Sequence, residues 1–218
     1  ASGKPEVVRS LLAMLEEARK ANQVVQLDGR IAGAGWDRTY PNLLGSTDWR
    51  GGARSGARQA RRNTIEPFTR NIVGPMEPMP LAFKHPSRPA PMTHGHVLGT
   101  ALVFESGLRT LVDDASGLPK EAAEILSGLP SAWDETRLLD GDPGHTVIIA
   151  RRKGRAWYIG GLNGDSGSKK RDIPMELVGT GLYQMVLVAD GHSPNELWVT
   201  KRERNAIDVQ SIKFLPYG

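Results

Sequence analysis

Cysteine is absent from the 218 residues of this chain. Its absence excludes a disulfide framework, a thiolate metal site and a cysteine nucleophile, but it leaves the redox compartment undetermined. Long apolar runs are missing as well, since no stretch approaches the roughly 18 residues that a membrane span needs. The N-terminus has no charged-then-apolar signal pattern. The sequence therefore predicts no membrane partner and leaves the localisation unknown.

An excess of one charge is also missing. Lys and Arg number 28 against 24 Asp and Glu, which gives a formal net charge of +4. Such a small excess says little about partners, although the sequence pI is about 9.5. With 39% hydrophobic and 24% charged residues, the composition indicates a globular chain with one good core or two small ones. Because it begins at Ala1 without Met, we expect a processed product or a piece of something longer.

The first 130 residues alternate helical and strand-like patterns. Residues 5–21 place apolar side chains at helical spacing, and residues 23–28 follow as a short β-branched run typical of a buried parallel strand. Residues 67–74 predict another strand. The apolar positions between 93 and 113 fit a helix, with Thr93 as its cap. These alternating patterns favour an α/β arrangement.

The pattern changes after Trp133. Runs of Val, Ile, Trp and Tyr are separated by the turn signals "DGDPG" and "RKGR", which is typical of antiparallel hairpins. We place the boundary near residues 128–137 and predict two domains, 1–130 and 131–218. A complete eight-stranded βα barrel takes about 250 residues, so the few strands of the first domain can supply only the last portion of one.

Several motifs carry a family resemblance. "RTYPN" (38–42), "PFTRNIVGPM" (67–76), "VFESGLRTLVD" (103–113) and "LPSAWDETRLLDGDPGHTVIIARRKGRAWYIGGLNG" (129–164) closely resemble glycoside hydrolase family 97. The resemblance runs from about residue 20 to the end. It implies the C-terminal portion of a (β/α)8 catalytic barrel followed by an antiparallel β-sandwich. Family members act on α-glucosides or α-galactosides, usually with bound calcium, and the parent family is periplasmic or secreted.

The chemistry implied by the resemblance needs two carboxyl groups, which in this sequence are not where the family has them. Gly29 stands where inverting members carry a Glu. Retaining members also carry Gly there and take their nucleophile from an earlier strand outside this chain. Thr47 aligns with a calcium-binding Glu, and Ala53, six residues on, aligns with the general acid. Asp48 is the nearest carboxylate to the first of these positions and the one possible metal ligand.

The candidate substrate-binding residues are Asp28, Arg38 and Asp48. Asp28 ends a predicted strand, and residues at strand C-terminal ends build barrel active sites. An Asp there can equally cap the following loop. The catalytic residues themselves stay unknown, because the aligned positions lack acids. By the resemblance calcium is a possible cofactor of the family, but it is doubtful for this chain.

The segment "RGGARSGARQARR" (50–62) has five arginines, three glycines and no acid. Arginine pairs phosphates and stacks on bases, so an RNA-binding arm is one interpretation. Only one "RGG" occurs, however, and no Phe or Tyr is interleaved. We therefore expect a solvated loop beside the barrel mouth rather than a nucleic-acid partner.

Other features have structural explanations. His94 and His96 fall at the start of a helix, where i and i+2 point to different sides, so they should not share an ion. Trp133, Trp157 and Tyr158 should pack in the sandwich or between domains. "WDETR" (133–137) predicts an ion pair holding barrel to sandwich, and "GLNGDSGSKK" (161–170) a surface turn.

The sequence therefore predicts a protein similar to α-glucosidases and α-galactosidases that hydrolyse glycosides through paired carboxylates. We expect little or no activity from this chain alone. A non-catalytic carbohydrate-binding or assembly module is the alternative. The expected partners are a carbohydrate and either a missing N-terminal portion or further copies of the chain.

Overall fold

The computed structural model describes residues 4–28, 35–47, 56–85, 88, 90–114, 116–205 and 208–218. Its first part contains a parallel sheet of β1 (Val25–Asp28), β2 (Leu43–Thr47) and β3 (Met76–Glu77), in the order β1-β2-β3. Helix α1 (Pro5–Lys20) covers this sheet through Leu15, which is fully buried against Leu27 and Leu43. The expected first helix and first strand are confirmed.

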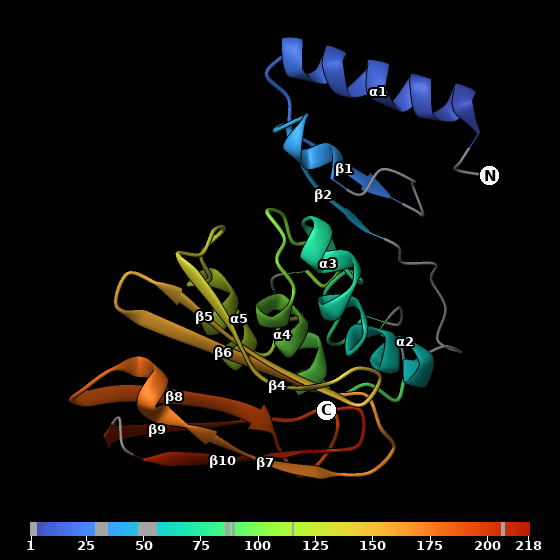
Figure 1. Cartoon of the computed structure of the whole chain (residues 1–218). Coiled ribbons are helices and arrows are strands. Elements are labelled where there is room, and N and C mark those ends of the chain that lie inside the picture. The colour runs from blue at the N-terminus through green and yellow to red at the C-terminus, as the bar shows by residue number, and fades with distance from the viewer. Residues whose placement is uncertain are drawn as a thin grey trace.

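Short helices fill the rest of the first part. They are η1 (Trp36–Arg38), α2 (Gly56–Asn63), η3 (Glu66–Phe68), α3 (Arg70–Val73), α4 (His94–Val103) and α5 (Lys120–Ser127). The main core gathers around α4, where Val97 and Ala101 pack with Phe83 and Met92. Helix α4 is buried on nearly every side, and Figure 1 shows it between the other helices and the antiparallel strands.

Two predicted elements differ in the structure. Residues 67–74 form η3 and α3 rather than a strand, because Pro67 fits the first turn of a helix and the strand itself is only Met76–Glu77. The helix expected over 93–113 ends at Val103. Its predicted continuation is not a buried helical face, since Leu108 and Leu111 are 44% and 39% exposed.

From residue 56 onward the arginine-rich segment is a helix and not the expected loop. Helix α2 begins at Gly56 and buries Gly56, Gln59, Ala60 and Asn63, which lie on one helical face. Arg58 and Arg61 are exposed. Residues 50–55, including Ala53, lie outside the described residues, so the earlier part of that prediction stays a prediction.

The second part is antiparallel, as predicted. Its strands are β4 (Glu135–Asp142), β5 (Thr146–Lys153), β6 (Ala156–Asn163), β7 (Lys169–Pro174), β8 (Leu182–Asp190), β9 (Leu197–Asn205) and β10 (Val209–Phe214), with η4 (Met175–Val178) after β7. They pair as β4-β5-β6, β10-β7 and β8-β9. In Figure 1 strands β7 to β10 form the layer farthest from α1, and β4 to β6 lie between that layer and α4.

Helix α4 approaches β6 through glycines. A Cβ atom on Gly99 would lie 2.8 Å from the carbonyl oxygen of Gly161, and one on Gly160 would lie 2.5 Å from the Cβ of Leu102. Both distances are too short for a real side chain. The two parts of the chain therefore meet backbone to backbone along this contact.

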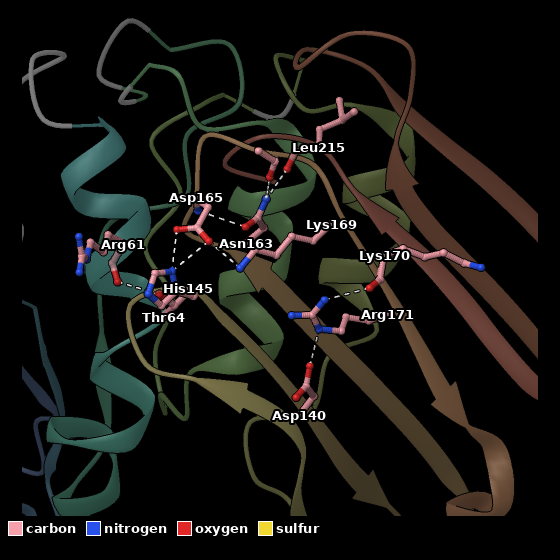
Figure 2. A network of polar contacts seen from close by, with 11 residues as sticks. Arg61, Thr64, Asp140, His145, Asn163, Asp165, Lys169, Lys170, Arg171 and Leu215 are labelled. Carbon is pink, nitrogen blue, oxygen red and sulfur yellow. Dashed lines mark hydrogen bonds and ion pairs between the residues drawn. The ribbon is translucent and has the colours of Figure 1, made fainter.

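A polar network ties the ends of several strands together (Figure 2). The buried Asn163 side chain donates to the carbonyl oxygens of Gly167 and Leu215, each at 2.8 Å, and accepts from the Asp165 amide at 3.1 Å. The turn at Gly144 meets the end of α2, where the Gly144 amide donates to the Thr64 carbonyl at 3.4 Å. Residues 161–170 are thus a fastened connection rather than a purely surface turn.

The "WDETR" segment does not link the two parts by an ion pair as predicted. Asp134 pairs with Lys153 at 3.1 Å, and Glu135 pairs with Arg152 at 2.9 Å and Arg137 at 2.5 Å. All of these partners belong to β4 or β5, because Arg137 follows Glu135 on the same strand and Arg152 is its cross-strand neighbour. Trp133 packs edge to face on Tyr158, with ring centroids 5.2 Å apart.

None of the helices within the described ranges combines the length and apolar character required to cross a lipid bilayer.

Candidate active-site edge of the parallel sheet

Three polar residues stand side by side where the parallel strands end. Asp28 pairs in register with Thr47, and Thr47 with Glu77. Because paired residues of parallel strands point to the same face, these side chains form one row across β1, β2 and β3. Asp28 is exposed, whereas Thr47 and Glu77 are buried. This row is the part of the molecule where Asp28 was expected to act.

Glu77 is the one residue of the row that the sequence did not suggest. Its carboxylate accepts from the Thr110 amide at 2.6 Å and from the Gln26 side chain at 3.0 Å. The bond with Gln26 joins β3 to β1 across the middle strand, β2. The residue of β2 that pairs with Gln26 is Gly45. Burial raises the pKa of Glu77, against the opposing effect of these hydrogen bonds and of Arg109. Glu77 is therefore a clamp between strands with both oxygens already bonded.

Arg109 completes the surroundings of Glu77. Its Nε donates to the Ala101 carbonyl at 3.1 Å, near the end of α4, and burial lowers the pKa of the guanidinium while Glu77 opposes that change. One nitrogen of this group, Nη2, is buried without a partner among the described residues. Burial thus disfavours the charge on both groups, and the charge of each opposes the pKa shift of the other.

The other predicted residues lie elsewhere or outside the description. Arg38 is exposed in η1 and donates to the Val73 carbonyl at 3.2 Å, just before β3 begins. It is therefore at the start of the sheet rather than beside Asp28. Gly29, Asp48 and Ala53 fall outside the described residues, so the structure brings together only Asp28 and Thr47 of the predicted set.

The row of Asp28, Thr47 and Glu77 offers few oxygen ligands for a cation such as calcium. Among the residues with described positions, no three or more His, Asp or Glu side chains come close enough to bind a metal ion. Thr47 separates Asp28 from Glu77, and Glu77 already accepts two hydrogen bonds. Because calcium takes six to eight oxygen ligands, the described side chains do not fit it.

Replacing Glu77 with alanine should lower the free energy of unfolding by roughly 2–4 kcal/mol, because the buried Thr110 amide and Gln26 side chain would lose their acceptor. Urea denaturation monitored by circular dichroism measures this. Glu77→Gln is the matched control, since its amide can still bond Gln26, whose own Oε1 has no partner among the described groups. Equal midpoints for Glu77→Ala and the wild type would contradict the assignment of Glu77 as a clamp.

The histidine pair of α4 behaves as two separate groups. The ring Nε2 of His94 lies 2.9 Å from the Phe83 carbonyl, whereas His96 Nε2 lies 3.0 Å from the Asn63 amide nitrogen. His94 thus donates through Nε2, and His96 accepts there. The two rings therefore bond to different neighbours, and the absence of a shared ion stays a prediction.

A second cluster of titratable groups lies at the turns of the antiparallel part (Figure 2). His145 Nδ1 is 2.9 Å from one oxygen of Asp165, and Lys169 is 2.5 Å from the other. Burial would raise the pKa of Asp165, but the bonds from Lys169 and His145 outweigh it and lower the pKa. Among the described residues no hydroxyl group is hydrogen-bonded to the His145 ring, whose bonds go to Asp165, so the pair stabilises the turn.

Comparison with known proteins adds a family context. Residues 132–218 match the family described as "Glycosyl-hydrolase 97 C-terminal, oligomerisation". The chain is 34% identical over 174 residues to a "Probable retaining alpha-galactosidase" of Streptomyces bingchenggensis, covering 77% of this chain and 26% of that protein. It is 30% identical over 193 residues to a "Retaining alpha-galactosidase" of Bacteroides thetaiotaomicron, covering 81% of this chain and 29% of that protein.

Solved structures show the same fold. A glycoside hydrolase family 97 enzyme from Pseudoalteromonas sp. strain K8, in complex with panose, superposes with a TM-score of 0.83 at 21% identity, over 96% of this chain and 36% of that one. A beta-arabinopyranosidase superposes with a TM-score of 0.84 at 23% identity, over 98% and 36%. The chain thus spans from about a quarter to just over a third of the length of these relatives.

Proposed function

Because this chain belongs to glycoside hydrolase family 97 and matches its C-terminal region, we propose that its first part, to about residue 130, is the last portion of a catalytic (β/α)8 barrel. The part from residue 131 is then the β-sandwich that follows it. Three parallel strands with helices between them support the first statement. Their C-terminal ends, with Asp28 and Thr47, would line the mouth of that barrel.

The proposed activity of the whole protein is hydrolysis of α-linked galactosides, or of the related glucosides, through paired carboxylates. The observation that carries it is the identity of 30% with a "Retaining alpha-galactosidase" and of 34% with a "Probable retaining alpha-galactosidase", over about four fifths of this chain. Gly29 is in keeping with the retaining branch, in which the nucleophile comes from an earlier strand. The nucleophile is therefore expected on an earlier strand outside this chain, whereas Ala53 stands at the position that aligns with the general acid.

We propose that this chain alone turns over little or no glycoside. Thr47 cannot ionise, and both oxygens of the buried Glu77 are engaged. Asp28 is then the one exposed carboxylate of the described row. Cleavage of a glycosidic bond by general acid–base catalysis needs a second carboxyl group on the other face of the sugar. No step through calcium is proposed, because the described side chains do not fit that ion.

A glycosidase assay tests this proposal directly. The purified chain is incubated with aryl α-galactosides and α-glucosides, with and without calcium, and release of the aryl alcohol is followed. We expect no rate above that of the buffer. Clear turnover that Asp48→Asn abolishes would overturn the proposal, since it would show that Asp48 supplies a working carboxylate.

An assembly role is the second candidate. The family description for residues 132–218 includes oligomerisation, and the β8-β9 hairpin exposes large apolar side chains, with Leu182 at 66% and Trp198 at 62%. Light scattering over a range of concentrations measures it. The assembly proposal expects a mass above that of one chain, shifted towards the monomer by Trp198→Ser together with Leu182→Ser. A monomer at every concentration would refute it.

A further inference from the structure

The antiparallel part contains a cleft far from the strand ends described above. We call it the interlayer cleft and define it by Trp157, Tyr183, Met185, Arg204, Gln210 and Ile212. Its volume is about 250 Å³. It adjoins a cavity of about 420 Å³ beside α4, which shares Trp157 and Ile212 with it. Together these spaces reach the size range of small-molecule sites.

Two buried polar atoms of the cleft lack hydrogen-bond partners within the described part of the chain. They are Arg204 Nε, which can only donate, and Gln210 Oε1, which can only accept. The orientation of the Gln210 amide is fixed, because its Nε2 donates to the Ser211 carbonyl at 2.6 Å. A buried donor and a buried acceptor left unpaired are costly. A ligand that satisfies both would remove that cost.

The two unpaired atoms restrict the chemistry of the ligand. A carboxylate could accept from Arg204 but could not donate to Gln210, and a phosphate could donate to Gln210 only through a protonated oxygen. A purely apolar ligand would leave both atoms unpaired. A hydroxyl group donates and accepts at once, so a ligand with several hydroxyl groups satisfies the two positions together.

Aromatic rings complete the wall of the cleft. Trp157 is held by Arg137, whose guanidinium carbon lies 5.2 Å from the ring centroid. Tyr183 is fixed by its hydroxyl, which donates to the Val178 carbonyl. Such rings present flat apolar surface, which suits the C–H face of a sugar ring while its hydroxyl rim meets polar atoms. We propose that the interlayer cleft is a second binding site that takes a neutral sugar ring.

This proposal goes beyond the proposed function, because it needs no turnover and none of the residues at the parallel strand ends. The probes are D-galactose and D-glucose, titrated into the whole chain and followed by calorimetry and by the indole NMR signals. We expect saturable binding with a dissociation constant on the order of 1 mM, with a shift of the Trp157 indole signal. That signal is assigned from its loss in Trp157→Phe.

Variants locate the binding. Gln210→Leu and Arg204→Met should each weaken the affinity by about tenfold or more, because each leaves a sugar hydroxyl facing an apolar side chain. Arg202→Met, on the same strand, is the matched control and should bind like the wild type. Inorganic phosphate should neither bind at the cleft nor displace the sugar.

Each other outcome counts against the proposal. Absence of saturable binding with either sugar overturns it, as does water alone in the cleft of a crystal soaked with galactose. Binding that Gln210→Leu and Arg204→Met leave unchanged, or a phosphate-specific shift of Trp157, overturns it too. If the variants fail to fold, the wild-type Trp157 signal decides: a shift on sugar addition supports the cleft, and an unmoved signal excludes it.

Discussion

Replacing Arg151 with methionine should lower the free energy of unfolding by roughly 3–5 kcal/mol. The guanidinium is buried and donates to the carbonyls of Leu102 and Val103, each at 2.8 Å, and to Thr136 Oγ1 at 3.0 Å. Those two carbonyls end α4, so Arg151 caps the helix from β5 and binds the two parts of the chain together. Methionine would keep the volume and leave the carbonyls without their donor.

Guanidinium-chloride denaturation of Arg151→Met and Arg152→Met measures this effect. Arg152 is the next residue of the same strand, but its pair with Glu135 is partly exposed to solvent. Such a pair contributes about 1 kcal/mol or less, so the control should unfold close to the wild type. Similar losses in the two variants would show that α4 does not depend on Arg151 as its cap.

The second large effect is a loss of stability in acid that depends on His96. Burial lowers the pKa of His96 to about 4, against the opposing effect of neighbouring backbone carbonyls, while an unfolded histidine keeps a pKa near 6.5. Between these values the unfolded chain binds more protons than the folded one. Stability should therefore fall as the pH drops from about 6.5 to 4, by roughly 3 kcal/mol in total.

The measurement is the free energy of unfolding at several pH values for the wild type and His96→Gln. Glutamine can still accept from the Asn63 amide, so the variant should fold. Its free energy of unfolding should fall by roughly 3 kcal/mol less than that of the wild type between pH 6.5 and 4. Burial raises the pKa values of Glu77 and Asp190, which adds stability at low pH that is lost as the pH rises. Because both proteins contain Glu77 and Asp190, subtracting one pH profile from the other removes that contribution. His192→Gln, at an exposed position, should keep the wild-type dependence of the unfolding free energy on pH. The prediction fails if His96→Gln also keeps the wild-type dependence.

The sequence predicted those elements whose pattern is local. Residues 5–20 and 25–28 repeat apolar side chains at a helical or strand period, and the hairpins after residue 133 are separated by clear turn signals. Helix α2 was missed because its inward face consists of Gly56, Gln59, Ala60 and Asn63. These residues follow helical spacing, but small and polar side chains give no hydrophobic signal.

The candidate site was predictable only in part, because its row is made by pairing between distant segments. Asp28 could be identified as the end of a strand from its own surroundings. Glu77 could not, since β3 has two residues and no period of its own, and its partners come from positions 26 and 110. Its one visible signal was an acid in the otherwise uncharged run "GPMEPMP".

We propose that this chain is the end of a sugar-cleaving barrel without the residue that attacks the sugar, and one experiment tests this proposal most directly. A retaining glycosidase forms a covalent glycosyl–enzyme intermediate on a carboxylate, which an activated fluorinated α-galactoside traps. Intact-protein mass spectrometry after incubation with that reagent measures it. We expect an unchanged mass for this chain, and the addition of one fluorogalactosyl group to Asp28, Asp48 or Glu77 would contradict the proposal.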